Sequence, residues 1–364
     1  MPAQAGIQFV GGFACQNRNL TLTENQPLTS IHTCNYLIWA EDMSLEAIRN
    51  LVREDLEATD QFIISQLNSD IPLIKQVIEY VLTCGGKRIR PLILLLCARA
   101  LGGRKIHHID IAAVIELFHM ATLLHDDVVD GSTLRRGHQT ANLVWNSATS
   151  VLIGDFLYSR TFRIIVELKN LRVLDTFSKA THYISEGEIL QMVNCHNPDT
   201  TPEFYYDIIQ RKTAKLFEIS TQLGALLATD SEPDIAAMRD YGLSLGLAYQ
   251  LIDDALDYSG LPEQTGKNVG QDISNGKTTL PLIYAMGKCK PASLTVLRHA
   301  IQKGSVEHLD DILEIIESTD AIKYTADAAR HHAELAKQAI SHLPATPYRK
   351  ALEEMSDFVV ARSY

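Results

Sequence analysis

The chain has 364 residues, of which 46% are apolar, and its formal net charge is −11. This length and composition predict a globular protein with a sizeable core. The acidic balance excludes an overall positive field that would attract nucleic acid or anionic lipid, so any phosphorylated ligand must be held by local groups.

Cysteine usage and hydropathy bear on where the protein works. The six cysteines are scattered singly, without a CxxC pair, which is typical of reduced thiols in a cytosolic protein. The longest apolar run, 91–98, is far shorter than the ~20 residues that a membrane span needs. We therefore expect a cytoplasmic protein with no integral membrane segment.

The first 42 residues differ from the rest of the chain. They are rich in Gly, Asn, Gln and Thr, and Arg18 is their only Lys or Arg. We expect 1–42 to be a poorly ordered extension and 43–364 to form one domain. Neither a secretory leader nor a mitochondrial presequence fits the composition. Our hypothesis is that natural translation starts at Met43, and a native peptide from 1–42 in mass spectra would refute it.

After Met43, nearly every segment has apolar residues at i, i+3 and i+4, with Gly or Pro between segments. No convincing alternating β pattern occurs. The fold class is therefore expected to be all-α, a single large bundle of ten or more helices. The expected helices include 45–66 capped by Ser44, 74–83, a helix starting near Pro91 and ending at Gly102, 111–130 capped by Asp110, and 235–258 capped by Asp234.

Two of these long helices end in the same acidic pattern. Asp126-Asp127-Val128-Val129-Asp130 closes the first, and Asp253-Asp254-Ala255-Leu256-Asp257 closes the second. Residues i and i+4 share a helix face, so each pattern makes a pair of like charges at the negative end of a helix dipole. This arrangement is unfavourable unless hard cations such as Mg²⁺ bind there. A solvated acidic surface is the alternative for either pattern alone.

Cationic residues accompany both clusters. Lys87, Arg88 and Arg90 lie in a turn between helices, and Arg135-Arg136-Gly137 follows the first cluster. Guanidinium and ammonium groups near a carboxylate pair suggest a diphosphate held by metal on one side and by cations on the other. Taken singly, each basic stretch is more often a solvated surface. Further cations are Lys212 and Lys215 on a probable helix, and Lys267 and Lys277 after the second cluster.

In this order the motifs GGKRIRP, LLHDDVVD, LRRG, KTA, YQLIDDALD, GKN and NGKTTLPL resemble those of the trans-polyprenyl diphosphate synthases, and most closely the bacterial octaprenyl type. The resemblance covers about 44–364. It implies the isoprenoid synthase fold with a central active-site cavity, a homodimer, and three Mg²⁺ ions bridged by diphosphate. It also implies condensation of an allylic diphosphate, expected to be farnesyl diphosphate, with isopentenyl diphosphate to extend a trans polyprenyl chain for quinones.

The resemblance also implies residue roles. Mg²⁺ ligands are expected to be Asp126, Asp130, Asp253 and Asp257, and the catalytic set is Asp126, Asp127, Asp130, Arg135, Lys212, Asp253 and Asp254. The isopentenyl diphosphate pocket would comprise Lys87, Arg90, His119 and Arg136, although a lone His on such a helix is usually a core residue. Contacts to the allylic diphosphate would come from Arg135, Lys212, Thr213, Gln250, Lys267 and Lys277.

Product length is expected to depend on the helix that leads to Asp126. In this family, bulky residues four and five positions before the first Asp stop chain growth, and here these are the small Thr122 and Ala121, with Phe118 one turn lower. An open tunnel and a product near C40, octaprenyl, follow from the resemblance. The alternatives are a geranylgeranyl or farnesyl diphosphate synthase, a terpene cyclase, a squalene-type condensing enzyme, or the noncatalytic subunit of a heteromeric synthase.

Overall fold

The structure is a computed structural model that describes residues 43–361 except 68, 104–106 and 260–268. The expected extension 1–42 and Lys267 lie outside the described residues. The described chain is 79% helical, which confirms the all-α expectation.

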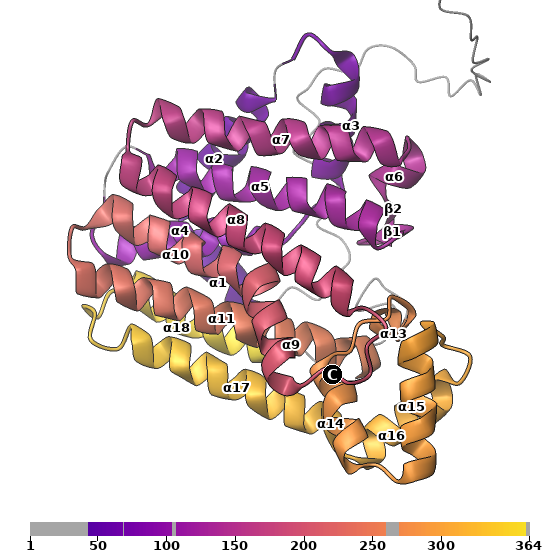
Figure 1. Cartoon of the computed structure of the whole chain (residues 1–364). Coiled ribbons are helices and arrows are strands. Elements are labelled where there is room, and N and C mark those ends of the chain that lie inside the picture. Colours follow the sequence, from indigo (N-terminus) through magenta and orange to yellow (C-terminus); the bar gives the residue numbers. More distant parts are fainter. Residues whose placement is uncertain (1–42, 68, 104–106, 260–268, 362–364) are drawn as a thin grey trace, which may run out of the picture. The chain divides into compact units, whose positions relative to one another are not determined.

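Figure 1 labels the helices along the chain. In chain order they are α1 (Met43–Asn50), α2 (Arg53–Gln66), α3 (Pro72–Thr83), α4 (Ile89–Ala100), α5 (His108–Val129), α6 (Ala141–Val144), α7 (Ser147–Glu167), α8 (Leu171–Asn194), α9 (Pro202–Ile209), the π-helix η2 (Gln210–Ala214), α10 (Lys215–Ala228), α11 (Glu232–Ser259), α13 (Gln271–Ser274), α14 (Leu280–Lys288), α15 (Pro291–Lys303), α16 (Leu309–Ser318), α17 (Ala321–Ala339) and α18 (Pro347–Ala361).

The long helices α5, α7, α8, α10 and α11 run alongside one another and enclose the main core (Figure 1). In α4, the side chains of 92–97 are all fully buried, and in α5 the whole stretch 111–118 is buried. A helix that is apolar on nearly every side belongs in the centre of a bundle. Among the described helices only α5 is long and apolar enough to cross a membrane, yet 61% of that stretch is buried inside the protein.

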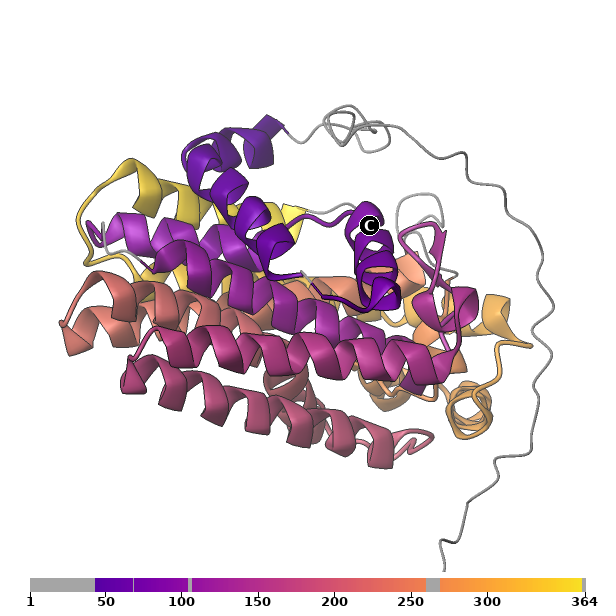
Figure 2. The same cartoon turned by 90° about the horizontal axis from the view of Figure 1, so that it is seen from above.

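A second, smaller core lies at one end of the bundle (Figures 1 and 2). It joins Tyr258, near the end of α11, to side chains of α13 to α16, including Ile273, Leu282, Leu297 and Ile312. These residues anchor the segment that follows the second acidic cluster, which keeps 269–279 close to that cluster.

Helix α5 approaches α7 closely because Gly154 lacks a side chain. A Cβ at Gly154 would lie 2.3 Å from Nε2 of His125. The glycine therefore allows His125, next to the first acidic cluster, to lie against α7. Its Nε2 is 3.2 Å from the carbonyl oxygen of Val151 and 3.4 Å from Asp155.

Several expected helix starts are wrong by a few residues. The stretch 45–66 forms two helices, because Leu51 and Val52 adopt turns that separate α1 from α2. Helix α1 already includes Ser44, and α5 and α11 begin before Asp110 and Asp234, so none of these three residues is an N-cap. Carboxylates in the first turn still complement the helix dipole, which explains why they resembled caps in the sequence.

The described chain also contains a small β-hairpin that sequence periodicity did not indicate. Strands β1 (Leu134–Arg135) and β2 (His138–Gln139) pair in antiparallel register, with Arg135 opposite His138. The two turn residues Arg136 and Gly137 both have positive φ. A type I′ hairpin turn requires two consecutive residues with positive φ. The strands have only two residues each, which is too short for an alternation of apolar and polar residues to be visible in the sequence.

Candidate active site

The two acidic clusters, at the ends of α5 and α11, are joined by the segment that follows α11. The backbone N–H of Asp272 donates to Asp257 at 3.0 Å, which fastens the segment to the second cluster. Five residues later, Lys277 donates to Asp130 of the first cluster at 2.7 Å. The segment that follows α11 therefore contacts both acidic clusters.

Each aspartate of the first cluster lies within 4.0 Å of a cationic side chain. Asp127 is buried and receives hydrogen bonds of 2.7–3.1 Å from Arg135, so its carboxylate is committed to that guanidinium. Asp126 lies 4.0 Å from the ammonium of Lys212. Burial raises the pKa of Asp126, Lys212 opposes the rise, and Asp130 adds to it.

The second cluster is held by neutral groups around Asp254. Its buried carboxylate accepts hydrogen bonds from the Tyr205 hydroxyl and, at 2.7 Å, from Nε2 of Gln250. The hydroxyl of Thr213 donates to Gln250 at 2.8 Å, which ties η2 to α11. Burial raises the pKa of Asp254 well above its usual value. Asp253 remains partly exposed beside it.

A group of cationic side chains forms a second subsite at the start of α4. Arg90 lies 3.1 Å from His119 and 4.5 Å from the ring centroid of Phe217. Arg136 covers Gly86, where a Cβ would lie 2.6 Å from the guanidinium. Burial lowers the pKa of Arg90, and burial together with the Arg90 charge lowers that of His119.

One atom of this subsite points to an anionic ligand. Nε of Arg90 is buried and has no hydrogen-bond partner among the described residues. A buried N–H group without a hydrogen-bond acceptor destabilises the folded protein. An oxygen atom of a bound anionic ligand would accept this hydrogen bond and remove the cost. Lys87 is exposed, with its ammonium 5.4 Å from the ring centroid of Phe358.

Two glutamates near the site, the buried Glu116 and the half-buried Glu188, were not singled out from the sequence. Glu116 accepts from Arg88 at 2.5 Å under the cationic turn, and Glu188 of α8 accepts from Lys212 at 2.5 Å. Burial raises the pKa of Glu188 to about 7, with Asp126 adding to the rise. A glutamate within the apolar run 111–118 was a usable signal, because a buried charge implies a partner. Glu188 had only the helix-interior Gly187 to mark it.

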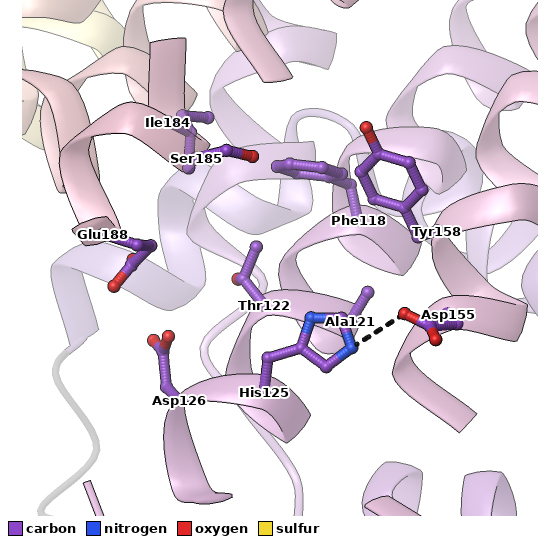
Figure 3. A pocket seen from close by; sticks show the side chains of 10 residues that line it. All are labelled: Phe118, Ala121, Thr122, His125, Asp126, Asp155, Tyr158, Ile184, Ser185 and Glu188. Atoms are coloured by element: carbon purple, nitrogen blue, oxygen red, sulfur yellow. Dashed lines mark ion pairs between the residues drawn. The ribbon is translucent and has the colours of Figure 1, made fainter. Parts of the chain in front are cut away.

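A cavity of ≈ 210 Å³ opens beside Asp126 (Figure 3). Thr122, Ala121 and Phe118 of α5, which precede this aspartate in the chain, also line the wall. The three chain-length residues predicted from sequence thus line one space. The remaining lining residues come from α5, α7 and α8, and they are His125, Asp155, Tyr158, Ile184, Ser185 and Glu188.

Aromatic rings close the cavity below Phe118. Its ring centroid lies 5.8 Å from that of Tyr158 and 5.5 Å from that of Phe177. Phe162 contacts both of these rings at 5.3 and 5.4 Å, so the four aromatics form one layer. The small side chains of Ala121 and Thr122 leave the space above this layer open.

The donor set suits divalent cations that share oxygen ligands with a bound anion. Among the described residues, no group of three His, Cys, Asp or Glu side chains converges on one point. However, the carboxylates of Asp126 and Asp130 already form ion pairs with the ammonium groups of Lys212 and Lys277, which shows that positive charge is favoured at this place. Hard oxygen ligands in this number fit Mg²⁺ or Ca²⁺ bound jointly by protein and phosphate, as Mg²⁺ commonly is.

Comparison with known proteins gives a consistent result. Residues 71–318 match the polyprenyl synthetase family. The octaprenyl diphosphate synthase of Escherichia coli is 45% identical over 321 residues, which cover 88% of this chain and 99% of that protein. A polyprenyl synthase from Caulobacter crescentus, solved with calcium and isoprenyl diphosphate, has a TM-score of 0.84 at 41% identity, covering 88% of this chain and 98% of that one.

A second solved structure is almost as similar. A decaprenyl diphosphate synthase from Rhodobacter capsulatus has a TM-score of 0.83 and 36% identity, and the match covers 87% of this chain and 99% of that one.

Proposed function

The chain belongs to the polyprenyl synthetase family, and from this premise we propose that it is a trans-prenyltransferase that adds successive isopentenyl units to an allylic diphosphate. The proposed starter is farnesyl diphosphate, and the proposed product is octaprenyl diphosphate for a quinone side chain. The observation that carries this proposal is the cavity of Figure 3, which leads from Asp126 past Thr122 and Ala121 toward an aromatic layer. Such a cavity holds a growing apolar chain below a charged diphosphate.

The first proposed role of the charged residues is to bind and orient two diphosphates. Arg90, His119 and Arg136 would hold isopentenyl diphosphate together with Lys87, and the unpaired Nε of Arg90 supports this. Around the allylic diphosphate, the proposed cations are Arg135, Lys212, Lys267 and Lys277, assisted by Thr213 and Gln250.

These cations stabilise the departing diphosphate as the allylic C–O bond ionises. The double bond of isopentenyl diphosphate then attacks the allylic cation, and the released diphosphate accepts the proton whose loss restores a trans double bond. Phe118, Ala121 and Ile184 keep water from the reacting carbons, since water would destroy the cation.

The proposed cofactor is Mg²⁺, three ions per site, held by Asp126 and Asp130 on one side and by Asp253 and Asp257 on the other. When bound, the ions supply Lewis-acid stabilisation of the leaving diphosphate. Asp127 and Asp254 would contribute indirectly, because they hold Arg135 and Gln250 in position by hydrogen bonds.

The function is tested by incubating purified protein with farnesyl diphosphate, radiolabelled isopentenyl diphosphate and Mg²⁺. Reversed-phase separation should show a ladder that ends near C40. A hydrocarbon product formed without isopentenyl diphosphate would indicate a cyclase, a C15 or C20 end point would indicate a shorter-chain synthase, and no turnover would indicate a noncatalytic subunit.

Product length gives a direct test of the cavity. Ala121→Tyr introduces a ring into the space above Phe118, so we expect products several isoprene units shorter while turnover of the first addition remains. A suitable control is Ile64→Tyr on the exposed side of α2, outside the cavity, and it should leave the ladder unchanged. An unaltered ladder from Ala121→Tyr would contradict the proposed path.

We further propose a homodimer, located in the cytoplasm and formed by 43–364. Exposed apolar side chains gather on α7 and α8, and Ile189, Met192 and Val193 form a stripe at helical spacing. Two copies of this chain would cover such a face by pairing it with itself. Light scattering of the purified protein tests this, because a monomeric mass would contradict it.

A further inference from the structure

Lys212 is held by a glutamate from a different helix. Its ammonium lies 2.5 Å from Glu188 of α8 but 4.0 Å from Asp126. The lysine side chain is only 17% exposed, and that of Glu188 is 31% exposed. In Figure 3, Glu188 and Asp126 lie near each other on the wall of the cavity. Lys212 therefore has a choice of two carboxylates, and it pairs with Glu188.

The backbone conformation of α8 and η2 positions Glu188 beside Lys212. A Cβ at Gly187 would lie 2.6 Å from Cβ of Arg211 and 2.8 Å from the backbone nitrogen of Lys212. The absence of a side chain at Gly187 lets α8 touch η2, and that contact places the next residue, Glu188, beside Lys212. The π-helix supplies the other half, since it sets the direction in which Lys212 leaves the backbone.

Without Glu188, the nearest carboxylate for Lys212 would be Asp126. An ammonium bound to Asp126 would compete with the divalent cation proposed to bind there, because both require the same oxygens. An unpaired lysine would instead gain rotational freedom and lose its orientation toward the cavity. Either outcome weakens binding of the allylic diphosphate and leaves the Arg90 subsite unaffected.

We propose that Glu188 is a positioning residue that holds Lys212 at the rim of the cavity, directed at the allylic diphosphate and away from Asp126. This inference rests on the proposed function, because it assigns the allylic diphosphate to the site of Asp126 and Lys212. Glu188 acts through Lys212 and does not itself contact the reacting atoms.

The test compares Glu188→Met, which removes both oxygens, with Glu188→Gln, which keeps an acceptor for Lys212. For Glu188→Met we expect the KM for the allylic diphosphate to rise about tenfold, as loss of one charge-assisted hydrogen bond implies. The half-saturating Mg²⁺ concentration should rise as well, and the KM for isopentenyl diphosphate should stay near the wild-type value. Glu188→Gln should recover part of the loss.

Glu186→Gln is the matched control. It lies on the same helix and pairs with Arg211 at 3.1 Å, outside the cavity, so we expect wild-type values. Equal changes in both KM values, or none, would overturn the proposal. A Glu188→Met variant as inactive as Asp126→Ala would also overturn it, because that result indicates a metal ligand.

Calorimetry separates this proposal from the proposed function. Binding of a thio-analogue of the allylic diphosphate, measured with Mg²⁺, should be about tenfold weaker for Glu188→Met than for the wild type. This ratio can be measured whether or not the wild type makes a polyprenyl chain. An inactive wild type would count against the function, and an unchanged binding ratio would count against Glu188.

Discussion

The two acidic clusters have the same spacing and the same place at a helix end, yet their surroundings differ. In the first cluster every aspartate faces a cation, whereas in the second Asp254 is bound by the neutral donors Tyr205 and Gln250. The three pairs of the first cluster are Asp126 with Lys212, Asp127 with Arg135, and Asp130 with Lys277.

This difference has a chemical consequence. The middle aspartate of the first cluster is bound by a guanidinium, whereas that of the second lies in a buried network of neutral donors. A repeated motif thus fixes where carboxylates lie along a helix. The partners, from segments distant in sequence, decide whether a buried aspartate faces a positive charge or neutral donors.

The largest expected effect is a loss of turnover when one aspartate of either cluster is removed, and it tests whether both clusters belong to one active site. Asp126→Ala and Asp253→Ala each remove a proposed metal ligand, so each should lower kcat by ~10²–10⁴. Incorporation of radiolabelled isopentenyl diphosphate measures this. Asp310→Ala, on the exposed first turn of α16, is the control and should retain full activity. Near-normal turnover in either cluster variant would mean that this cluster is not part of the site.

A smaller effect on stability should separate the two middle aspartates. Asp127→Asn leaves Arg135 without its charge partner and should lower the free energy of unfolding by about 1–3 kcal/mol. Asp254→Asn keeps an acceptor for Tyr205, and because burial raises the pKa of Asp254, a neutral side chain suits its place. We expect a cost below about 1 kcal/mol. Denaturant unfolding measures both, and a reversed order would contradict the contrast.

Asp55, a carboxylate outside both clusters, provides a reference for these stability effects. Burial of Asp55 raises its pKa, but hydrogen bonds from His108 and Arg99 outweigh this and lower it from 3.8 to about 2. A carboxylate with a depressed folded pKa stabilises above its unfolded pKa, and this stability disappears as pH falls through the folded value. Asp55→Asn should therefore cost about 1–2 kcal/mol at pH 6, after allowance for solvent screening.

The difference between this variant and the wild type should shrink as the pH falls toward 2 and should disappear only below it, where Asp55 of the folded protein is neutral. Unfolding measured at several pH values checks this. A cost that stayed constant down to pH 2 would show that packing, and not the charge of Asp55, is responsible.

The sequence predicted the helical class and the position of both clusters at the C-terminal ends of helices, because both depend on local periodicity. Helix starts were less predictable, since Asp110 and Asp234 favour a first turn as well as a cap. The break at Leu51 and Val52 has no Gly or Pro to mark it. The hairpin around Arg136 was missed because two-residue strands show no pattern.

Partners across the site were the least predictable feature. The sequence placed Asp130 and Lys277 in one site, but their direct contact depends on how α13 packs at the end of the bundle. Glu188 gave no signal of its own, because its role depends on Gly187 and on the π-turn of a different segment. Tertiary packing, which a single sequence does not display, decides such pairings.

The π-helix η2 makes the number of residues between α9 and α10 important in its own right. A π-turn accommodates one residue more than an α-turn. Deletion of a single residue here could be absorbed by a regular helix, but the side chains on one side of the deletion would rotate by roughly 100° relative to the other. Lys212 would then lose its contact with Glu188, and Thr213 its hydrogen bond with Gln250, while the helix itself survived. The number of residues in η2 is therefore as important for the position of these side chains as their identity.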